Sequence, residues 1–155
     1  MTWSRREWLR ATALGAAGVF VTRRMFGERV NAPIAITVYK TPTCGCCKEW
    51  VAHLTENGFA PTVHDLADLT QTKSSLGVPQ ALESCHTAVV GRYVVEGHVP
   101  ADVIRQLVGE STKAIAGLSV PGMVQGSPGM EVGRKEPYDV LAFTREGKTF
   151  VYARR

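Results

Sequence analysis

The spacing of apolar residues predicts a strand, a helix and a second strand near the start of residues 33–155. Residues 34–39 form a β-branched run that is typical of a buried strand. From about residue 46 to residue 57, one helix face is apolar, with Cys47, Trp50, Val51 and Leu54 at i, i+3, i+4 and i+7. Gly58 is placed to end that helix. Residues 61–66 then predict a strand parallel to the first, because a crossover helix joins the two.

The remaining elements complete an α/β pattern. We expect a weak helix over residues 68–76, then strands at 87–90 and 93–96 joined by a Gly-Arg turn. A further helix should begin with Pro100 in its first turn and end before Gly109. A closing hairpin is predicted at residues 138–143 and 149–153. The order β-α-β-α-β-β-α is typical of a thioredoxin-like core.

Residues 117–133 follow neither the helical nor the strand period. The segment holds five glycines and two prolines, so we expect a shaped loop. It also holds both methionines of residues 33–155, Met123 and Met130. Each methionine has two readings that stay open here, an anchor against an apolar patch or a soft-metal ligand.

The basic charge of the chain lies in its first 32 residues. That segment has six arginines and two glutamates, whereas residues 33–155 have twelve basic and twelve acidic side chains. A nucleic-acid partner therefore lacks electrostatic support. Residues 4–10, Ser-Arg-Arg-Glu-Trp-Leu-Arg, resemble a twin-arginine export signal and precede a weakly apolar stretch, residues 11–21. The stretch is about half of the roughly 20 residues that span a bilayer.

We therefore divide the chain into an export signal, residues 1–32, and one folded domain, residues 33–155. The alternative for the leader, an amphipathic surface helix, lacks a polar face over residues 13–21. Export would place the domain in the periplasm, with the twin-arginine machinery as a partner and membrane contact only if the leader stays uncleaved. The four cysteines would then meet an oxidising compartment.

Three cysteines occupy four positions at the predicted start of the first helix. Cys44 and Cys47 form a CxxC that follows a strand and opens a helix, as in thioredoxin-like units. The helix N-terminus favours thiolates. A dithiol oxidoreductase does not need the additional Cys46, whereas a soft-metal site does. Two structural disulfides are the alternative, but neighbouring cysteines close small loops and stabilise little.

The fourth cysteine, Cys85, precedes the third core strand. In thioredoxin-like folds the loop at this place faces the CxxC, so Cys85 should approach the other three cysteines. His86 is a candidate metal ligand, a hydrogen-bond donor to a ligand, or only the first residue of a strand. We expect His98 to support the turn before the next helix, and Trp50 to pack in the core.

These motifs together resemble the CopG-type periplasmic copper-resistance family, long described only as a domain of unknown function. The resemblance rests on residues 43–50, 84–90, 96–100, 120–123 and 126–131. It implies a thioredoxin-like domain that binds copper. The implied sulfur ligands are Cys44, Cys46, Cys47, Cys85, Met123 and Met130, and His86 is a further candidate.

Soft thiolate and thioether ligands select Cu(I). Zinc more often uses paired CxxC motifs, and this chain has one. Adjacent Cys46 and Cys47 cannot easily bind one tetrahedral ion together, so we hypothesise a multinuclear Cu(I)–thiolate cluster. The expected function is to sequester Cu(I) or hand it to a periplasmic copper-transfer protein.

An enzyme is the main alternative. In a thiol–disulfide oxidoreductase, Cys44 would attack and Cys47 would resolve. A variant of this alternative couples the dithiol chemistry to the redox state of copper. A third reading is an interaction module stapled by disulfides, which would bind no metal and tolerate Met123→Leu. The sequence leaves the choice between binding protein and enzyme open.

Overall fold

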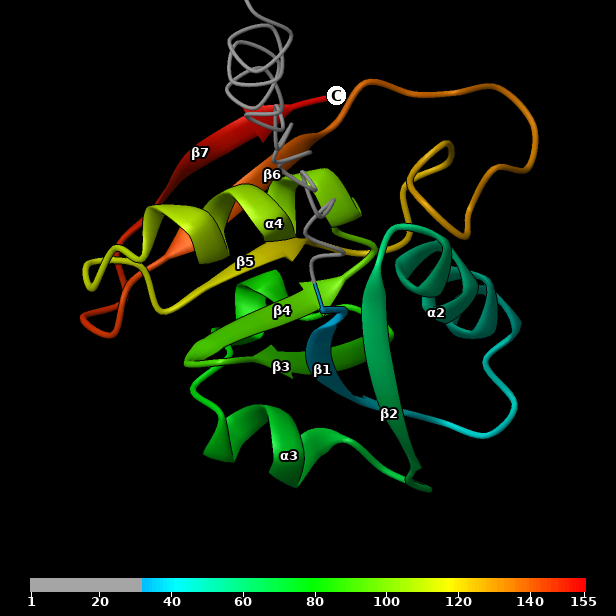
Figure 1. Cartoon of the computed structure of the whole chain (residues 1–155), viewed down its shortest axis with the longest axis horizontal. Coiled ribbons are helices and arrows are strands. Elements are labelled where there is room, and N and C mark those ends of the chain that lie inside the picture. The colour runs from blue at the N-terminus through cyan, green and yellow to red at the C-terminus, as the bar shows by residue number, and fades with distance from the viewer. Residues whose placement is uncertain (1–31) are drawn as a thin grey trace, which may run out of the picture. The chain divides into compact units, whose positions relative to one another are not determined.

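Residues 32–155, the part of the chain that the computed structural model describes, fold around one mixed sheet (Figure 1). The strands are β1 (Ile34–Lys40), β2 (Phe59–Asp65), β3 (His86–Val90), β4 (Tyr93–Gly97), β5 (Gly117–Val120), β6 (Asp139–Phe143) and β7 (Thr149–Arg154). The helices are α2 (Gly45–Glu56), α3 (Thr70–Ser75) and α4 (Ala101–Glu110), with a 3-10 turn at Gln80–Leu82. The export signal predicted for residues 1–32 lies, except for its last residue, outside the described residues. No helix within residues 32–155 is long and apolar enough to cross a membrane.

The strands lie in the order β2-β1-β3-β4-β5-β6-β7. β1 and β2 are parallel, as the crossover through α2 predicts, and β3 runs antiparallel to both β1 and β4. β5 is parallel to β4, and the β6–β7 hairpin extends the sheet from β5. The α/β prediction is therefore confirmed, and the C-terminal hairpin belongs to the same sheet as the first four strands.

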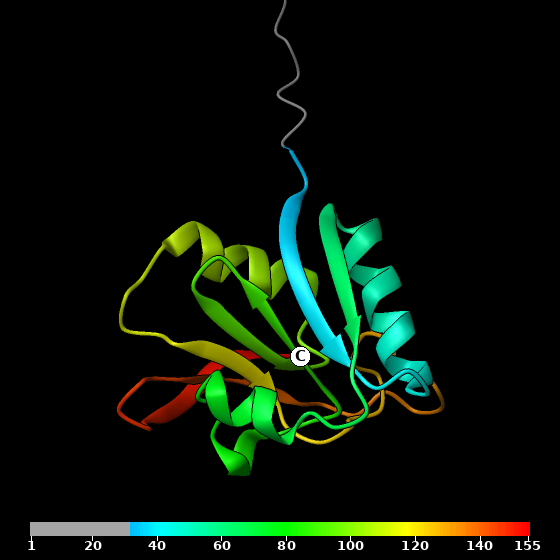
Figure 2. The same cartoon turned by 90° about the horizontal axis from the view of Figure 1, so that it is seen from below.

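Helices cover both faces of this sheet (Figure 2). α2 and α4 pack their apolar stripes on one face, and Trp50, Leu54, Ile104 and Leu107 are fully buried there. The other face carries a smaller cluster formed by Val78, Leu82, Val94 and Phe143. Burying each such side chain contributes about 1.5–3 kcal/mol, so both clusters stabilise the sheet that carries the cysteines.

Several boundaries shift by one or two residues: β2 covers 59–65 where 61–66 was predicted, and α3 covers 70–75 where 68–76 was predicted. Two further differences concern β5 and α4. Residues 117–120, expected as loop, form the fully buried strand β5. A Cβ at Gly117 would lie 2.3 Å from the Val94 carbonyl oxygen and 2.4 Å from the Phe143 ring, so neighbouring groups fill the side-chain space. α4 also continues through Gly109 to Glu110. A glycine inside a helix costs about 1 kcal/mol, which the burial of the Val103–Leu107 stripe outweighs.

Candidate metal centre

The first turn of α2 carries the CxCC motif. Cys44 is the N-cap residue, in an extended conformation, and its sulfur accepts a hydrogen bond from the Cys47 backbone N–H at 3.3 Å. A turn precedes it, in which the Cys44 N–H donates to the Thr41 carbonyl at 3.2 Å. Because Cys44 caps the helix and Cys47 begins its buried stripe, both sulfurs lie at the positive end of the helix dipole.

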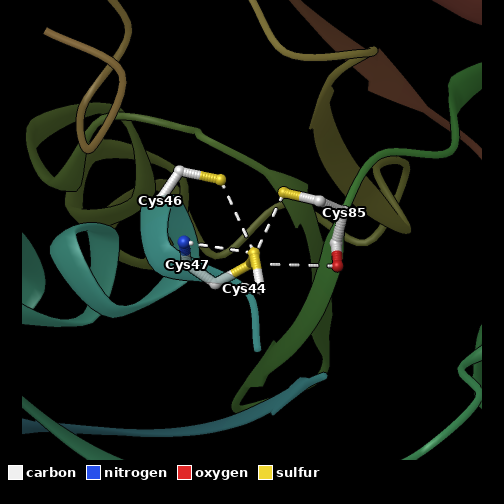
Figure 3. Close-up of side chains that lie close together, drawn as sticks. All are labelled: Cys44, Cys46, Cys47 and Cys85. Atoms are coloured by element: carbon white, nitrogen blue, oxygen red, sulfur yellow. Dashed lines mark hydrogen bonds between the residues drawn. A yellow bond between two sulfur atoms is a disulfide. The ribbon is translucent and has the colours of Figure 1, made fainter. Parts of the chain in front are cut away.

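The four cysteine sulfurs converge on one small volume (Figure 3). Cys44 and Cys47 form a disulfide, whereas Cys46 and Cys85 are free. The Cys46 sulfur lies 3.5 Å from Cys44 Sγ, and the Cys85 sulfur lies 3.6 Å from Cys47 Sγ. All four sulfurs lie within 4.8 Å of one another. The approach of Cys85 to the CxCC motif, which the fold analogy predicted, is present in the structure.

Cys85 is held as a neutral thiol in this form. Burial, together with the neighbouring Cys46, raises its pKa to about 12. A thiol in such surroundings ionises when a cation takes the place of its proton. The surroundings of Cys85 therefore suit a metal ligand better than a free nucleophile.

Two imidazoles lie against the Cys85 sulfur. His98 Nε2 is 3.1 Å from it and His86 Nδ1 is 3.3 Å from it. On its other side, His98 Nδ1 lies 2.8 Å from the Pro128 carbonyl oxygen. A carbonyl oxygen only accepts, so Nδ1 carries the proton and the Nε2 lone pair faces the sulfur. Burial lowers the pKa of His98, which favours this neutral form.

The prediction for His98 therefore needs correction. It was expected to support a turn, but its side chain is fully buried and its Nε2 points to Cys85. No signal in the sequence alone indicated this. His98 directly follows β4, and only the structure shows that all five β4 residues are buried.

His86 is the second buried imidazole and packs against Trp50, with ring centroids 4.3 Å apart. Burial lowers its pKa well below the usual value, so the ring is neutral. Its Nε2 atom has no hydrogen-bond partner within residues 32–155. Trp50 is buried as predicted, and its Nε1 donates to the Val99 carbonyl at 2.9 Å. A buried nitrogen without a hydrogen-bond partner destabilises the fold, and a bound ion is one partner that would remove this cost.

The methionine loop, residues 121–131, closes over the start of α2. Gly129 has φ +81°, and a Cβ there would lie 2.6 Å from the Cys46 carbonyl oxygen and 2.7 Å from the Trp50 nitrogen. Only glycine allows this approach. Met130, the next residue, is half-buried, whereas Met123 is 60% exposed. The loop backbone beside Met130 therefore lies against the first turn of α2, and Met123 lies at the surface.

The residues present fit a soft metal ion. Among the described residues, one group that could hold an ion consists of four cysteines, and a second consists of Cys85, His86 and His98. Neither group includes a carboxylate, the ligand that Mg²⁺ and Ca²⁺ prefer. Cys85 belongs to both groups, so sulfur and imidazole donors surround one site.

Comparisons with known proteins agree with this site. A family model described as a protein of unknown function, DUF411, matches residues 82–130. Two solved structures of copper resistance protein CopG, form 2 and form 1, are each 48% identical to this chain, cover 79% of it and 98% of their own length, and have a TM-score of 0.75. Curated protein sequences give no match. At this identity and coverage, the chain belongs to the CopG-type copper-resistance family.

Proposed function

We propose that this protein is an exported Cu(I)-binding protein that sequesters copper or hands it to a periplasmic transfer protein. Cys44, Cys46, Cys47 and Cys85 supply thiolates to a multinuclear cluster once the disulfide is reduced. His98 and His86 supply imidazole nitrogens. Met130, and Met123 from the exposed side of its loop, are thioether ligands.

One observation carries this proposal: four sulfurs lie within 4.8 Å of one another and no carboxylate belongs to the group. Thiolates and thioethers select Cu(I) over harder ions. Adjacent Cys46 and Cys47 cannot easily bind one tetrahedral ion together, so their sulfurs would bridge neighbouring ions.

The fold and the leader support the cellular part of the proposal. The strand order β2-β1-β3-β4, with β1 and β2 parallel and β3 antiparallel to its neighbours, is the arrangement expected of a thioredoxin-like unit. The Arg-Arg motif of residues 4–10 supports export through the twin-arginine route to the periplasm. Uncleaved, the leader would tether the domain to the membrane.

An anaerobic titration tests copper binding. Reduced full-length protein is titrated with Cu(I) beside a competing chelator, and native mass spectrometry counts the ions bound. We expect several ions per chain that resist the chelator. Uptake of one ion at most would contradict the cluster, and no uptake would contradict copper binding.

The disulfide favours a second function, a thiol–disulfide oxidoreductase. The Cys44–Cys47 bond takes up two electrons and two protons when it opens, and two Cu(I) ions release two electrons when they become Cu(II). Cys44, which is half-buried, would then be the attacking thiol and the buried Cys47 the resolving one.

The substitution Cys46→Ser separates the two functions. A dithiol couple between Cys44 and Cys47 should survive it, whereas a cluster that shares Cys46 should lose ions. The measurements are the reduction potential of the disulfide and the copper count on the same variant.

A further inference from the structure

A buried polar network lies beneath the segment that carries Cys85. Glu96 of β4 is fully buried, and Lys73 of α3 is buried opposite it, forming an ion pair. Thr87 of β3 lies between them: its hydroxyl donates to Glu96 Oε2 at 2.7 Å and accepts from Lys73 Nζ at 3.0 Å.

One hydrogen bond links the side chains of this network to the segment before β3. Glu96 Oε1, which accepts from Lys73, also accepts the backbone N–H of Ser84 at 2.6 Å. Ser84 is the residue before Cys85. The carboxylate therefore ties the backbone next to a cysteine of the candidate metal centre to the interior of the sheet.

Stability alone does not explain this network. Removing two charges from water is expensive, and a buried ion pair replaced by apolar residues of similar volume is often as stable or more stable. What an apolar replacement would not reproduce is the acceptor for the Ser84 amide, because a hydrogen bond from a backbone donor to a charged group is short and directional.

The side chain of Ser84 is held from the other side as well. Its hydroxyl donates to the Gly122 carbonyl, and the Gly122 N–H donates to the Glu83 carbonyl at 3.4 Å. Gly97, at φ +69°, leaves room for this side chain, since a Cβ there would lie 2.5 Å from Ser84 Oγ. Ser84 therefore joins the segment of Cys85 to the loop that carries Met123.

We propose that Glu96 is a positioning residue of the metal centre: through the Ser84 amide it fixes Cys85 where its sulfur can share ions with Cys46 and Cys47. The inference rests on the proposed copper function. Glu96 itself does not contact the cysteines and is not a ligand. Lys73 and Thr87 orient its carboxylate so that Oε1 faces Ser84.

The test compares two variants that both lack the buried charges. Lys73→Met with Glu96→Gln keeps an amide oxygen that accepts from Ser84, whereas Lys73→Met with Glu96→Leu has no acceptor there. Cu(I) affinity is measured on reduced full-length protein against a competing chelator. We expect the glutamine variant to stay within about threefold of wild type and the leucine variant to bind about 10–100-fold more weakly, as when a partner of a metal ligand is removed.

Hydrogen exchange of the Ser84 amide in the metal-free protein is the second measurement. It should be protected in wild type and in the glutamine variant, and exposed in the leucine variant. Should the leucine variant fail to fold, Glu96→Asp takes its place. The aspartate side chain is one methylene shorter, so the flexible Lys73 side chain can still reach its carboxylate, whereas the Ser84 amide cannot. Copper affinity should therefore fall as in the leucine variant.

The outcomes separate this inference from the function on which it rests. Equal copper affinities for the glutamine and leucine (or aspartate) variants, with wild type binding tightly, would overturn the role of Glu96 and leave copper binding intact. Wild type that takes up no copper would overturn both. Loss of Ser84 protection without loss of affinity would show that the anchor exists but does not position Cys85, which also overturns the proposal.

Discussion

His98, a proposed metal ligand, has its tautomer set by a single backbone carbonyl. Pro128 accepts from Nδ1 at 2.8 Å, which fixes the tautomer and leaves the Nε2 lone pair directed at Cys85, 3.1 Å away. Imidazole ligands in metal sites commonly have their second nitrogen held in this way. The contact spans 30 residues of sequence, so the two segments must fold together before the imidazole is oriented.

Replacing His98 with glutamine should weaken Cu(I) binding about 10–100-fold, because the nitrogen donor is lost while the side chain stays polar. His64→Gln is the matched control, since His64 is exposed on β2. Both affinities are measured by chelator competition. Equal values for the two variants would contradict ligation by His98.

Individual residues of the site differed in how well the sequence predicted them. The CxCC motif is local, so Cys44, Cys46 and Cys47 could be assigned from spacing, and the fold analogy brought in Cys85. His98 depends on a carbonyl in a loop with no regular period, which spacing cannot predict. Lys73 lies in a weakly predicted helix and Glu96 in a strand, and charged residues there are usually exposed to solvent. The sequence therefore could not predict that both are buried.

At the scale of elements, α2 supplies more than cysteines. The N-cap of α4 is Pro100, which has no side-chain acceptor, and the free Ala101 N–H instead donates to His53 Nε2 of α2 at 3.1 Å. This contact joins the last turn of α2 to the first turn of α4. A helix N-cap bond of this kind contributes about 1 kcal/mol.

The free energy of unfolding should decrease as pH falls, because protonation of His53 removes this hydrogen bond. Burial lowers the pKa of His53, although Glu131, Glu56 and Asp102 partly oppose the shift. His53 therefore takes up its proton at a higher pH in the unfolded chain, near pH ~6.5, than in the folded protein. The bond stabilises the fold in full above that pH, and this stabilisation is lost as pH falls through the lower pKa of the folded state. His53→Gln keeps an acceptor that does not titrate. Urea unfolding of both proteins from pH ~7.5 to ~5.5 should show wild type losing stability relative to the variant; parallel curves would contradict this.

The methionine loop gives a second test at this scale. Gly129→Ala places a methyl group against the Cys46 carbonyl and the Trp50 nitrogen, so the loop must move away from α2. Gly133→Ala is the matched control: φ is +82° there, but the nearest group is the flexible Gln125 side chain at 3.3 Å. Both variants carry a backbone strain of about 1–2 kcal/mol. Only Gly129→Ala should also lower copper affinity, measured by chelator competition. Equal affinities for the two variants would show that the approach of the loop to α2 does not affect copper binding.

Elements with a clear apolar period were predicted well, and β5 was not. Leu118 and Val120 alternate with Gly117 and Ser119, but a run of four residues that begins with glycine is a weak strand signal. Ser119 is buried, and its hydroxyl donates to the Leu82 carbonyl at 2.6 Å. The burial of β5 is set by what packs around it, namely the ring of Phe143 and the 3-10 turn, and the segment's own sequence does not reveal these neighbours.

At the scale of the whole domain, the closing hairpin is part of the core. Phe143 of β6 is fully buried against Val94 of β4 and the backbone of Gly117. The hairpin and the first four strands therefore share a cluster and should unfold together.

Phe143→Ala should destabilise the domain by about 3–5 kcal/mol, since a buried ring is removed and Gly117 cannot fill the space. Phe150→Ala, on the exposed side of β7 with 47% of its surface accessible, is the control and should cost under about 1 kcal/mol. Urea unfolding followed by tryptophan fluorescence and by circular dichroism should give coincident single transitions for wild type. A separate transition for the hairpin would show that it is an independent appendage.

The disulfide between Cys44 and Cys47 would, under the proposed function, couple metal uptake to reduction. Only Cys46 and Cys85 offer thiols while that bond exists, and reduction doubles the number. Copper capacity would then depend on the reducing power of the compartment as well as on the amount of protein. A shortage of reductant would leave copies in the disulfide form with two thiols each, so the capacity to take up copper would be low without any change in the number of chains.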